Sequence, residues 1–501
     1  MAALQLHSLM AFTLIIIAIT TTTPRVQSIG VNWGTTASHP LPPSKVVELL
    51  KLNKINKVKL FDSNPQILES LSGTNIAVTV GIPNSMLHAL NSSVKAAESW
   101  VHDNLTRYLS SDRTRIEFIT SVLVSLVLLA LKVHCGWRRA VSPKLRFTIL
   151  PFRRWAAISI EAALIRAKLA DKVKVVIPCS FDAFQSESGL PSKGHFRPDI
   201  NKTMISVLKF LTKTRSPFFV SISPFLSYHQ NKNISLDFAL FRQSAHAHND
   251  TRKSYKNSLE LSYDTLITAL TVAGFPQIDI VISQIGWPTD GAPNATVSNA
   301  EAFTKGLLDH FRDKKGTPLR PRATQMEIYL YTLFDEDRRN ITAGDFERHW
   351  GLFTFDGQAK YEVDFDQGPK RLVNAQAVEY LPSRWCVVNN NLNVSNATAR
   401  AAEACVDGAD CTALSPGGSC WNLSWPGNVS YAFNSYYQEH DQRAESCDFG
   451  GLGMITTVDP SVGNCRFNVE LKASFSVLVH GLDFGHHLVL FGLVILVLQR
   501  L

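Results

Sequence analysis

Several patterns that mark other classes of enzyme are missing from this 501-residue sequence. It has no Cys-x2-Cys pair and no cluster of potential metal ligands, so a metal site is not expected. It has no Gly-rich phosphate loop and no Ser/His/Asp series, and its histidines are scattered. These absences leave nucleotide-dependent, metal-dependent and serine-hydrolase chemistry without support, and no cofactor is expected.

Acidic residues are absent from one long segment. Residues 118–160 hold seven basic residues and no Asp or Glu, which accounts for almost all of the net charge of +8. The rest of the chain is close to neutral and shows no basic stripe interleaved with aromatics. Nucleic-acid binding is therefore not expected.

The amino terminus and the glycosylation motifs predict a secreted protein. An apolar run from Leu9 to Ile19 and the sequence Val26-Gln27-Ser28 are typical of a signal peptide over residues 1–28. Eleven Asn-x-Ser/Thr motifs follow, more than a cytosolic chain would need. They lie at Asn91, Asn104, Asn201, Asn233, Asn249, Asn294, Asn340, Asn393, Asn396, Asn422 and Asn428.

Six of the eight cysteines are concentrated near the carboxyl end, at Cys386, Cys405, Cys411, Cys420, Cys447 and Cys465. In a secreted chain this density predicts a disulfide framework, whose connectivity the spacing alone leaves open. Cys135 and Cys179 lie outside the cluster and have no expected partner.

Short apolar runs alternate with longer helical stretches over the first two thirds of the chain, which predicts an α/β fold, a (β/α)8 barrel. Catalytic groups in such barrels follow the carboxyl ends of the strands. The eight candidate strands are Ile29–Trp33, Val58–Phe61, Ile76–Val80, a broken one near Ile116–Ile119, Val173–Ile177, Phe218–Ile222, Ile278–Ser283 and Ile328–Phe334.

Residues 281–288 read Val-Ile-Ser-Gln-Ile-Gly-Trp-Pro, a β-branched run that ends in a turn. The run resembles the strand-seven signature of plant glucan endo-1,3-β-glucosidases, glycoside hydrolase family 17. Further fragments match in order, at Ile29–Thr35, Val58–Asp62, Val80–Asn84, Pro178–Cys179, Ser223–Tyr228, Leu333–Asp337 and Phe346–Phe353. The resemblance implies a (β/α)8 barrel over residues 29–366 and retaining hydrolysis of β-1,3-glucan such as callose.

Retaining hydrolysis needs two carboxyl groups, one as nucleophile and one as general acid/base. The nucleophile position of the family is Gln284 here, and an amide cannot act as a nucleophile, although it can hydrogen-bond to sugar hydroxyls. The family's acid/base belongs to a Val-Gly-x-Glu signature after strand four, which this chain lacks; it is expected after Ile119. Both catalytic carboxylates are thus missing.

The anomalous segment, about residues 118–157, has three interpretations. An unspliced intron or other gene-model fault explains the lost motif, the odd charge and the odd hydropathy together. A genuine loop insertion and a membrane segment are the alternatives. The apolar run from Ile119 to Leu131 is shorter than the roughly 20 residues that a spanning helix needs.

Other residues match the family's substrate site. By motif, Glu336 and Glu347 support the catalytic pair, Asp335 binds substrate, and Arg339 stands where relatives carry Lys. Spacing alone does not predict that Glu336 and Glu347 form a substitute catalytic pair. Trp33, Trp287 and Trp350 are candidate sugar platforms, with core packing as the alternative for Trp33 and Trp350.

A linker over residues 367–384 precedes a region, residues 385–467, that is similar to the X8 domain, a carbohydrate-binding module. Its family pattern implies three disulfides: Cys386 with Cys447, Cys405 with Cys411, and Cys420 with Cys465. Among its aromatics, Tyr431 and Tyr437 are candidates for stacking on sugars, with core packing as the alternative.

The last residues, 474–501, run from small side chains to the apolar stretch Leu488–Leu498. This pattern is typical of a GPI-attachment signal, with Ser474 as the candidate attachment site and the outer leaflet of the plasma membrane as the location. A spanning helix is the alternative, but the stretch is short for one. A monomer is expected.

Two functions from different classes follow. The first is a membrane-anchored endo-1,3-β-glucanase that acts on cell-wall glucan, with this sequence recording a damaged or mis-spliced version. The second is a non-catalytic cell-surface protein that binds β-1,3-glucan through the barrel and the X8 module.

Overall fold

The computed structural model describes residues 29–109, 114–121, 143–242, 244, 246–313, 316–321, 326–365, 371–391 and 393–472, with the backbone alone for 143–153. The predicted signal peptide, residues 122–142 of the acid-free segment and the predicted GPI signal lie outside these residues, as do Cys135 and Ser474. Within the described ranges no helix is both long enough and apolar enough to cross a bilayer.

Eight parallel strands form one sheet in the order β5-β4-β3-β2-β1-β12-β11-β8. The ring closes because Cys179, just beyond β5, bridges Val220 of β8, and its amide donates to the Phe219 carbonyl at 2.9 Å. The predicted (β/α)8 barrel is therefore confirmed. The strands are β1 (Ile29–Trp33), β2 (Lys57–Leu60), β3 (Ala77–Ile82), β4 (Arg115–Ser121), β5 (Lys174–Val176), β8 (Phe218–Ser221), β11 (Ile280–Ile285) and β12 (Glu327–Leu330).

The prediction of a broken fourth strand is wrong. β4 runs without interruption and pairs with β3 and β5, with one register shift opposite Val78 and Thr79. Polar residues inside the run obscured the strand in the sequence, and the barrel tolerates them because Glu117 finds a cationic partner in Lys57.

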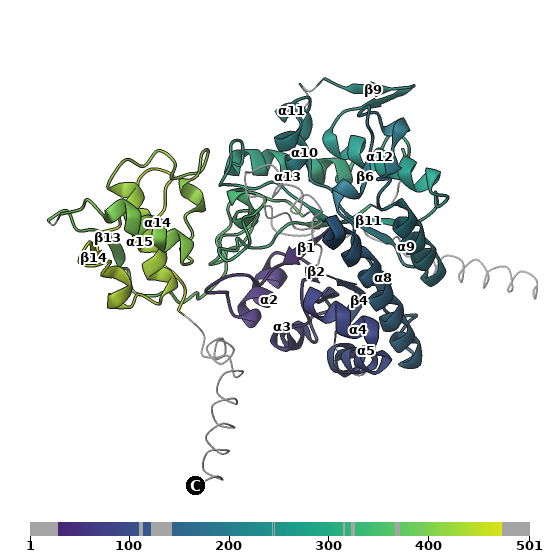
Figure 1. Cartoon of the computed structure of the whole chain (residues 1–501), viewed down its shortest axis with the longest axis horizontal. Coiled ribbons are helices and arrows are strands. Elements are labelled where there is room, and N and C mark those ends of the chain that lie inside the picture. The colour runs from purple at the N-terminus through teal and green to yellow at the C-terminus, as the bar shows by residue number, and fades with distance from the viewer. Residues whose placement is uncertain are drawn as a thin grey trace, which may run out of the picture.

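Helices surround the barrel and cover the outer face of the sheet (Figure 1). Their starts follow local capping chemistry: Asn257 accepts from the amide of Glu260 at 2.9 Å, and Thr296 accepts from that of Asn299 at 3.2 Å. The helices are α2 (Pro43–Leu52), α3 (Pro65–Leu71), α4 (Leu87–Ser92), α5 (Val94–Val101), α6 (Arg107–Leu109), α8 (Pro143–Arg166), α9 (Asn201–Thr214), α10 (Pro224–Gln230), α11 (Leu236–Ala239), α12 (Ser258–Val272) and α13 (Val297–Arg312). Two short antiparallel pairs, β6 (Phe184–Gln185) with β7 (His195–Phe196) and β9 (His248–Asp250) with β10 (Lys253–Tyr255), decorate the loops.

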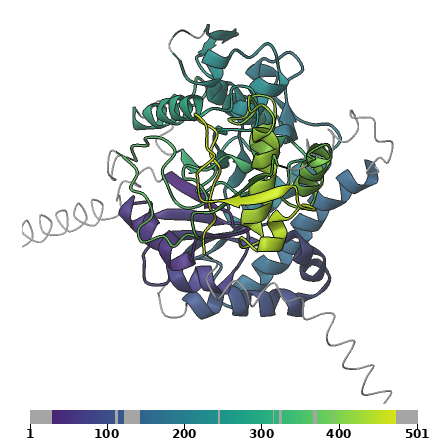
Figure 2. The same cartoon turned by 90° about the vertical axis from the view of Figure 1, so that its left-hand side faces the viewer.

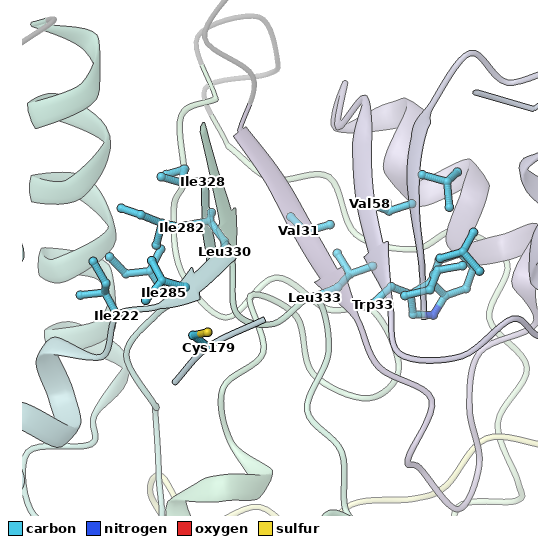
Figure 3. Close-up of a cluster of buried hydrophobic side chains, with 14 of the residues drawn as sticks. Val31, Trp33, Val58, Cys179, Ile222, Ile282, Ile285, Ile328, Leu330 and Leu333 are labelled. Carbon is cyan, nitrogen blue, oxygen red and sulfur yellow. The ribbon is translucent and has the colours of Figure 1, made fainter. Parts of the chain in front are cut away.

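Branched side chains from neighbouring strands form the core. Figure 3 shows Ile282 and Ile285 of β11 beside Ile328 and Leu330 of β12, with Val31 of β1 close by. All five are buried. Such two-sided burial explains why these strands read as nearly continuous apolar runs.

The cysteine-rich region folds as a separate small unit beside the barrel (Figure 1). An antiparallel pair, β13 (Trp385–Val388) with β14 (Gly453–Thr456), packs with α14 (Ala397–Val406) and α15 (Gly427–Glu439). The disulfides join Cys386 to Cys447, Cys405 to Cys411 and Cys420 to Cys465, the same pairs that the resemblance implies. Cys179 of the barrel is buried and is in no disulfide.

The interior of the barrel is not wholly apolar, because alternation along β2 points both of its lysines inward. Lys57, at the start of the strand, pairs with Glu117 at 3.0 Å and with Glu327. Lys59, two residues nearer the carboxyl end, donates to Asn32 Oδ1 at 3.0 Å and lies 4.2 Å over the Phe61 ring. Burial, and then the nearby Arg339 cation, lower the pKa of Lys59 from 10.5 to about 7.

We expect Lys57→Met to lower the free energy of unfolding by about 2–3 kcal/mol, because two carboxylates near the base of the barrel lose their shared cation. The loss should be smaller than for a wholly buried pair, since the Glu117 and Glu327 side chains are 24% and 25% exposed. Denaturant unfolding checks this. The control Lys45→Met, which breaks the exposed pair with Glu48, should cost less than about 0.5 kcal/mol. Equal losses in both variants would contradict the interpretation.

We expect the stability of the wild type relative to Lys59→Met to depend on pH. Between the lowered folded pKa of about 7 and the unfolded value of 10.5, Lys59 is protonated only when unfolded. Wild-type stability should therefore gain about 1.4 kcal/mol per pH unit from about pH 7 upward, and lose it as the pH falls towards 7. Below that pH the difference should be constant. Denaturant unfolding of both proteins from pH 6 to pH 9 tests this. A stability difference between wild type and Lys59→Met that is the same at every pH would refute it.

Candidate active site

The loop after β12 places an acidic side chain directly over the loop after β1. Glu336 is almost completely buried, and its Oε1 accepts from the backbone amide of Thr36 at 2.8 Å. A β-carbon at Gly34 would lie 2.2 Å from the same oxygen, so only glycine leaves room for the carboxylate. The absence of a side chain at position 34 thus fixes where Glu336 sits.

Arg339 joins the two predicted supporting acids. Its Nη1 donates to Glu336 Oε2 at 2.7 Å, and its Nε donates to Glu347 Oε2 at 3.3 Å. The guanidinium also lies 4.9 Å over the Tyr331 ring. The structure therefore brings Glu336, Arg339 and Glu347 together, although eleven residues separate the two acids in the sequence.

Burial governs the electrostatics of this cluster. It raises the pKa of Glu347, and the Arg339 cation only partly opposes the shift. It also raises the pKa of Tyr331, whose ring packs against Trp350 at 5.4 Å between centroids. The cluster combines one cation with two carboxyl groups, of which Glu336 is the more deeply buried. Cations and carboxyl groups of this kind can hydrogen-bond to hydroxyl groups.

Asp335 is engaged elsewhere. Both of its oxygens accept from Lys360 Nζ at 2.7 Å, and Oδ1 also accepts from the amide of Gly351 at 2.8 Å. These contacts tie the loop after β12 to the segment that contains Gly351 and Lys360. The predicted substrate contact through Asp335 would compete with this structural ion pair.

Gln284 lies at the carboxyl end of β11, as the strand-seven signature predicts. It is half-buried, and an irregularity in the register separates it from Ile282. Its backbone carbonyl accepts from the Ile222 amide at 3.0 Å, whereas none of the described residues hydrogen-bonds to its side-chain amide. The turn that follows needs Gly286, because a β-carbon there would lie 2.1 Å from the Tyr331 carbonyl oxygen.

Below the ends of these strands lies a polar layer that the sequence reasoning missed. Asn32 donates from Nδ2 to the carbonyls of Ser283 and Leu330 at 3.1 and 3.0 Å, and its Oδ1 accepts from Lys59. Ser283 immediately precedes Gln284. The signal was present, because Asn32 and Lys59 interrupt runs that are otherwise apolar.

Strand four supplies no carboxylate to this end of the barrel. The described part of the strand ends with Thr120 and Ser121, and residues 122–142 contain no Asp or Glu. Glu117 lies near the opposite end, where it pairs with Lys57 and with Arg115. Glu117 therefore cannot replace the general acid/base that is expected after Ile119.

The predicted sugar platforms in the barrel are core residues, so this interpretation is corrected. Trp287 is 1% exposed, its Nε1 donates to the Asn294 carbonyl at 2.9 Å, and its ring packs edge-on to Phe225. Trp350 is 4% exposed and Trp33 is also buried. None of these rings offers an open face to a sugar.

The same correction applies to the X8 domain. Tyr437 is fully buried within α15, and Tyr431 is half-buried with its ring edge-on to Phe467 at 5.3 Å. The exposed indoles of this domain are instead Trp421 and Trp425, at 52% and 49%. Aromatic type alone did not separate the core rings from the surface rings.

Comparison with known proteins assigns both parts of the chain. Residues 29–365 match the model of glycosyl hydrolases family 17, and residues 384–454 match the X8 domain. "Glucan endo-1,3-beta-glucosidase 9" of Arabidopsis thaliana is 60% identical over 455 residues, 90% of each chain, and "Glucan endo-1,3-beta-glucosidase 5" of the same plant is 42% identical over 450 residues, 89% of each.

A solved structure agrees with these matches. That of "CJP38, a beta-1,3-glucanase and allergen of Cryptomeria japonica pollen" aligns with a TM-score of 0.61 at 32% identity and covers 68% of this chain and 99% of its own. The structure of this chain agrees with these similarities. It has a barrel closed at Cys179, the Glu336–Arg339–Glu347 cluster at the mouth of that barrel, and a disulfide-rich domain beside it. The chain belongs to glycosyl hydrolases family 17 and carries an X8 domain.

Proposed function

We propose that this chain acts on β-1,3-glucan, such as callose of the cell wall, as a glycoside hydrolase of the endo-1,3-β-glucanase type with a retaining mechanism. The proposal is carried by the Glu336–Arg339–Glu347 cluster at the mouth of the barrel. It is supported by the 60% identity of the chain, over 455 residues, to "Glucan endo-1,3-beta-glucosidase 9". Arg339, whose side chain is 26% exposed, can donate hydrogen bonds to sugar hydroxyls, and the half-buried amide of Gln284 can supply a donor and an acceptor. No cofactor is needed for this chemistry.

One observation favours a second candidate function. A retaining enzyme needs two carboxyl groups about 5–5.5 Å apart, but this chain has an amide at Gln284 and no acid in residues 118–160. Glu336 and Glu347 do not replace them, since both are already paired with Arg339. The second candidate is therefore a non-catalytic protein that binds β-1,3-glucan at the cell surface.

We also propose that the chain is a secreted, monomeric glycoprotein held at the outer leaflet of the plasma membrane by a GPI lipid, attached at Ser474. None of the eleven glycosylation motifs has a buried asparagine, which supports glycosylation of the chain. The small residues and apolar stretch of 474–501 support the lipid attachment.

Reducing-end release from a soluble β-1,3-glucan separates the two functions. The non-catalytic function predicts that the chain as it stands turns over on the order of 10⁴-fold more slowly than an intact relative, because the nucleophile is missing. Gln284→Glu, combined with a Val-Gly-x-Glu segment after β4, should recover turnover if the rest of the site is sound. Gln284→Met with the same segment is the control and should stay inactive. Fast turnover by the unmodified chain would refute the non-catalytic function.

We expect Trp421→Ala and Trp425→Ala each to weaken binding to a soluble β-1,3-glucan by roughly fivefold, because stacking of a sugar on an open indole contributes about 1 kcal/mol. Titration calorimetry measures the affinity. Trp155 is the matched control, since its side chain is 51% exposed but lies on helix α8 of the barrel. If Trp155→Ala lowers the affinity as much, or if neither X8 variant changes it, the assignment of these indoles is wrong.

A further inference from the structure

The X8 domain contacts the barrel at the loops that carry the candidate active site. The domain, in green to yellow, lies beside the barrel in Figure 1 and in front of it in Figure 2. On the barrel side the contacts come from the loops after β1, β11 and β12. The pairs are His39 with Asp441, Asp290 with Ser419, Arg338 with Glu439, Asp345 with Ser415, Arg348 with Asp410, and His349 with Thr412.

These contacts are close and specific. Asp290 accepts from both the amide and the hydroxyl of Ser419, at 2.7 and 2.5 Å. His349 Nε2 lies 2.7 Å from Thr412 Oγ1. The backbones also touch, because a β-carbon at Gly417 would lie 2.5 Å from the amide nitrogen of Pro293. Such an interface fixes the orientation of the domain and does not merely tether it.

Arg348 connects the X8 domain to the active-site loop in one step. Its Nη1 donates to Asp410 Oδ1 at 3.0 Å, and its Nε donates to the Arg339 carbonyl at 3.1 Å. Its own carbonyl accepts from the Glu336 amide, also at 3.1 Å. The backbones of Glu336 and Arg339 are thus held by the carbonyl and the side chain of one residue, Arg348, that the X8 domain anchors.

Arg338 makes the second connection. It forms an ion pair with Glu439 at the end of α15, and it directly precedes Arg339. The Glu439 side chain is 5% exposed, so this carboxylate depends on the arginine for charge balance. On the other side of the loop, Asp337 accepts from the amide of Ser38 at 2.9 Å.

We propose that the X8 domain positions the active-site loop of the barrel: Glu439 and Asp410 hold Arg338 and Arg348, which keep Glu336 and Arg339 in place for a β-1,3-glucan chain. In this inference, which rests on the proposed function, the two domains form one rigid binding unit. Asp410 and Glu439 are positioning residues of the glucan site although they belong to the other domain.

Charge exchange across one contact tests the proposal in the full-length chain. Arg338→Glu and Glu439→Arg each place like charges together, and the double variant restores opposite charges. We expect each single variant to speed amide hydrogen exchange in residues 335–349 and to weaken binding of a soluble β-1,3-gluco-oligosaccharide, both by about tenfold. The double variant should return both values to within about threefold of the wild type.

The control is the same exchange in an exposed ion pair of the X8 domain that is not one of the six contacts with the barrel loops. Arg400 and Glu403 pair at 2.7 Å on α14, with side chains 51% and 58% exposed. Arg400→Glu, Glu403→Arg and their double variant should leave both the affinity and the exchange of 335–349 unchanged.

A variant without new charge covers the case in which a single charge reversal does not fold. Ser415→Ala with Ser419→Ala removes the hydroxyl contacts to Asp345 and Asp290. We expect faster exchange in residues 344–349 and an affinity about threefold lower.

Any of three results would overturn the proposal. The amide hydrogen exchange of the loop could stay at the wild-type rate when the interface is broken, or the affinity for the oligosaccharide could be the same in the interface variants as in the wild type. The double variant could also fail to restore the values that the single variants change. If the wild type binds no oligosaccharide at all, the proposed function fails. Hydrogen exchange and its rescue then still decide whether the X8 domain positions the loop.

Discussion

Parallel pairing of the barrel strands is the constraint on which the rest of the structure depends. Because all eight strands run in the same direction, their carboxyl ends face the same side. β12 pairs with both β1 and β11, so the loops after these three strands are neighbours in space, although they lie up to 300 residues apart in the chain, as the contact between Thr36 and Glu336 shows. Both the charged cluster and the surface that receives the X8 domain are built from these loops.

The sequence predicted the strands well because their physical cause is local. β-Branched runs bounded by turn residues suit a sheet that is buried on both faces, and all eight runs became strands. Individual roles were harder to predict. Trp287 and Tyr437 are buried while Trp421 is exposed, and a choice between identical ring types depends on the packing of residues distant in sequence. Contacts such as that of Asp290 with Ser419 leave no periodic signal at all.

The charge balance of the site is set by two cations and two carboxylates, because position 284 is an amide. The groups that remain at the carboxyl ends of the strands are Arg339 and the buried Lys59, set against Glu336 and Glu347. Burial and the Arg339 cation both lower the pKa of Lys59, which favours its neutral amine at this end of the barrel.

The missing side chain of Gly34 has a consequence for how this site can vary. The carboxylate of Glu336 fills the volume that a β-carbon at position 34 would occupy. Any larger residue at position 34 would displace the Glu336 carboxylate and separate it from Arg339, even though neither Glu336 nor Arg339 is itself replaced. Gly34, in the loop after β1, therefore limits which side chain the loop after β12 can place at position 336. The two positions can be redesigned only as a pair.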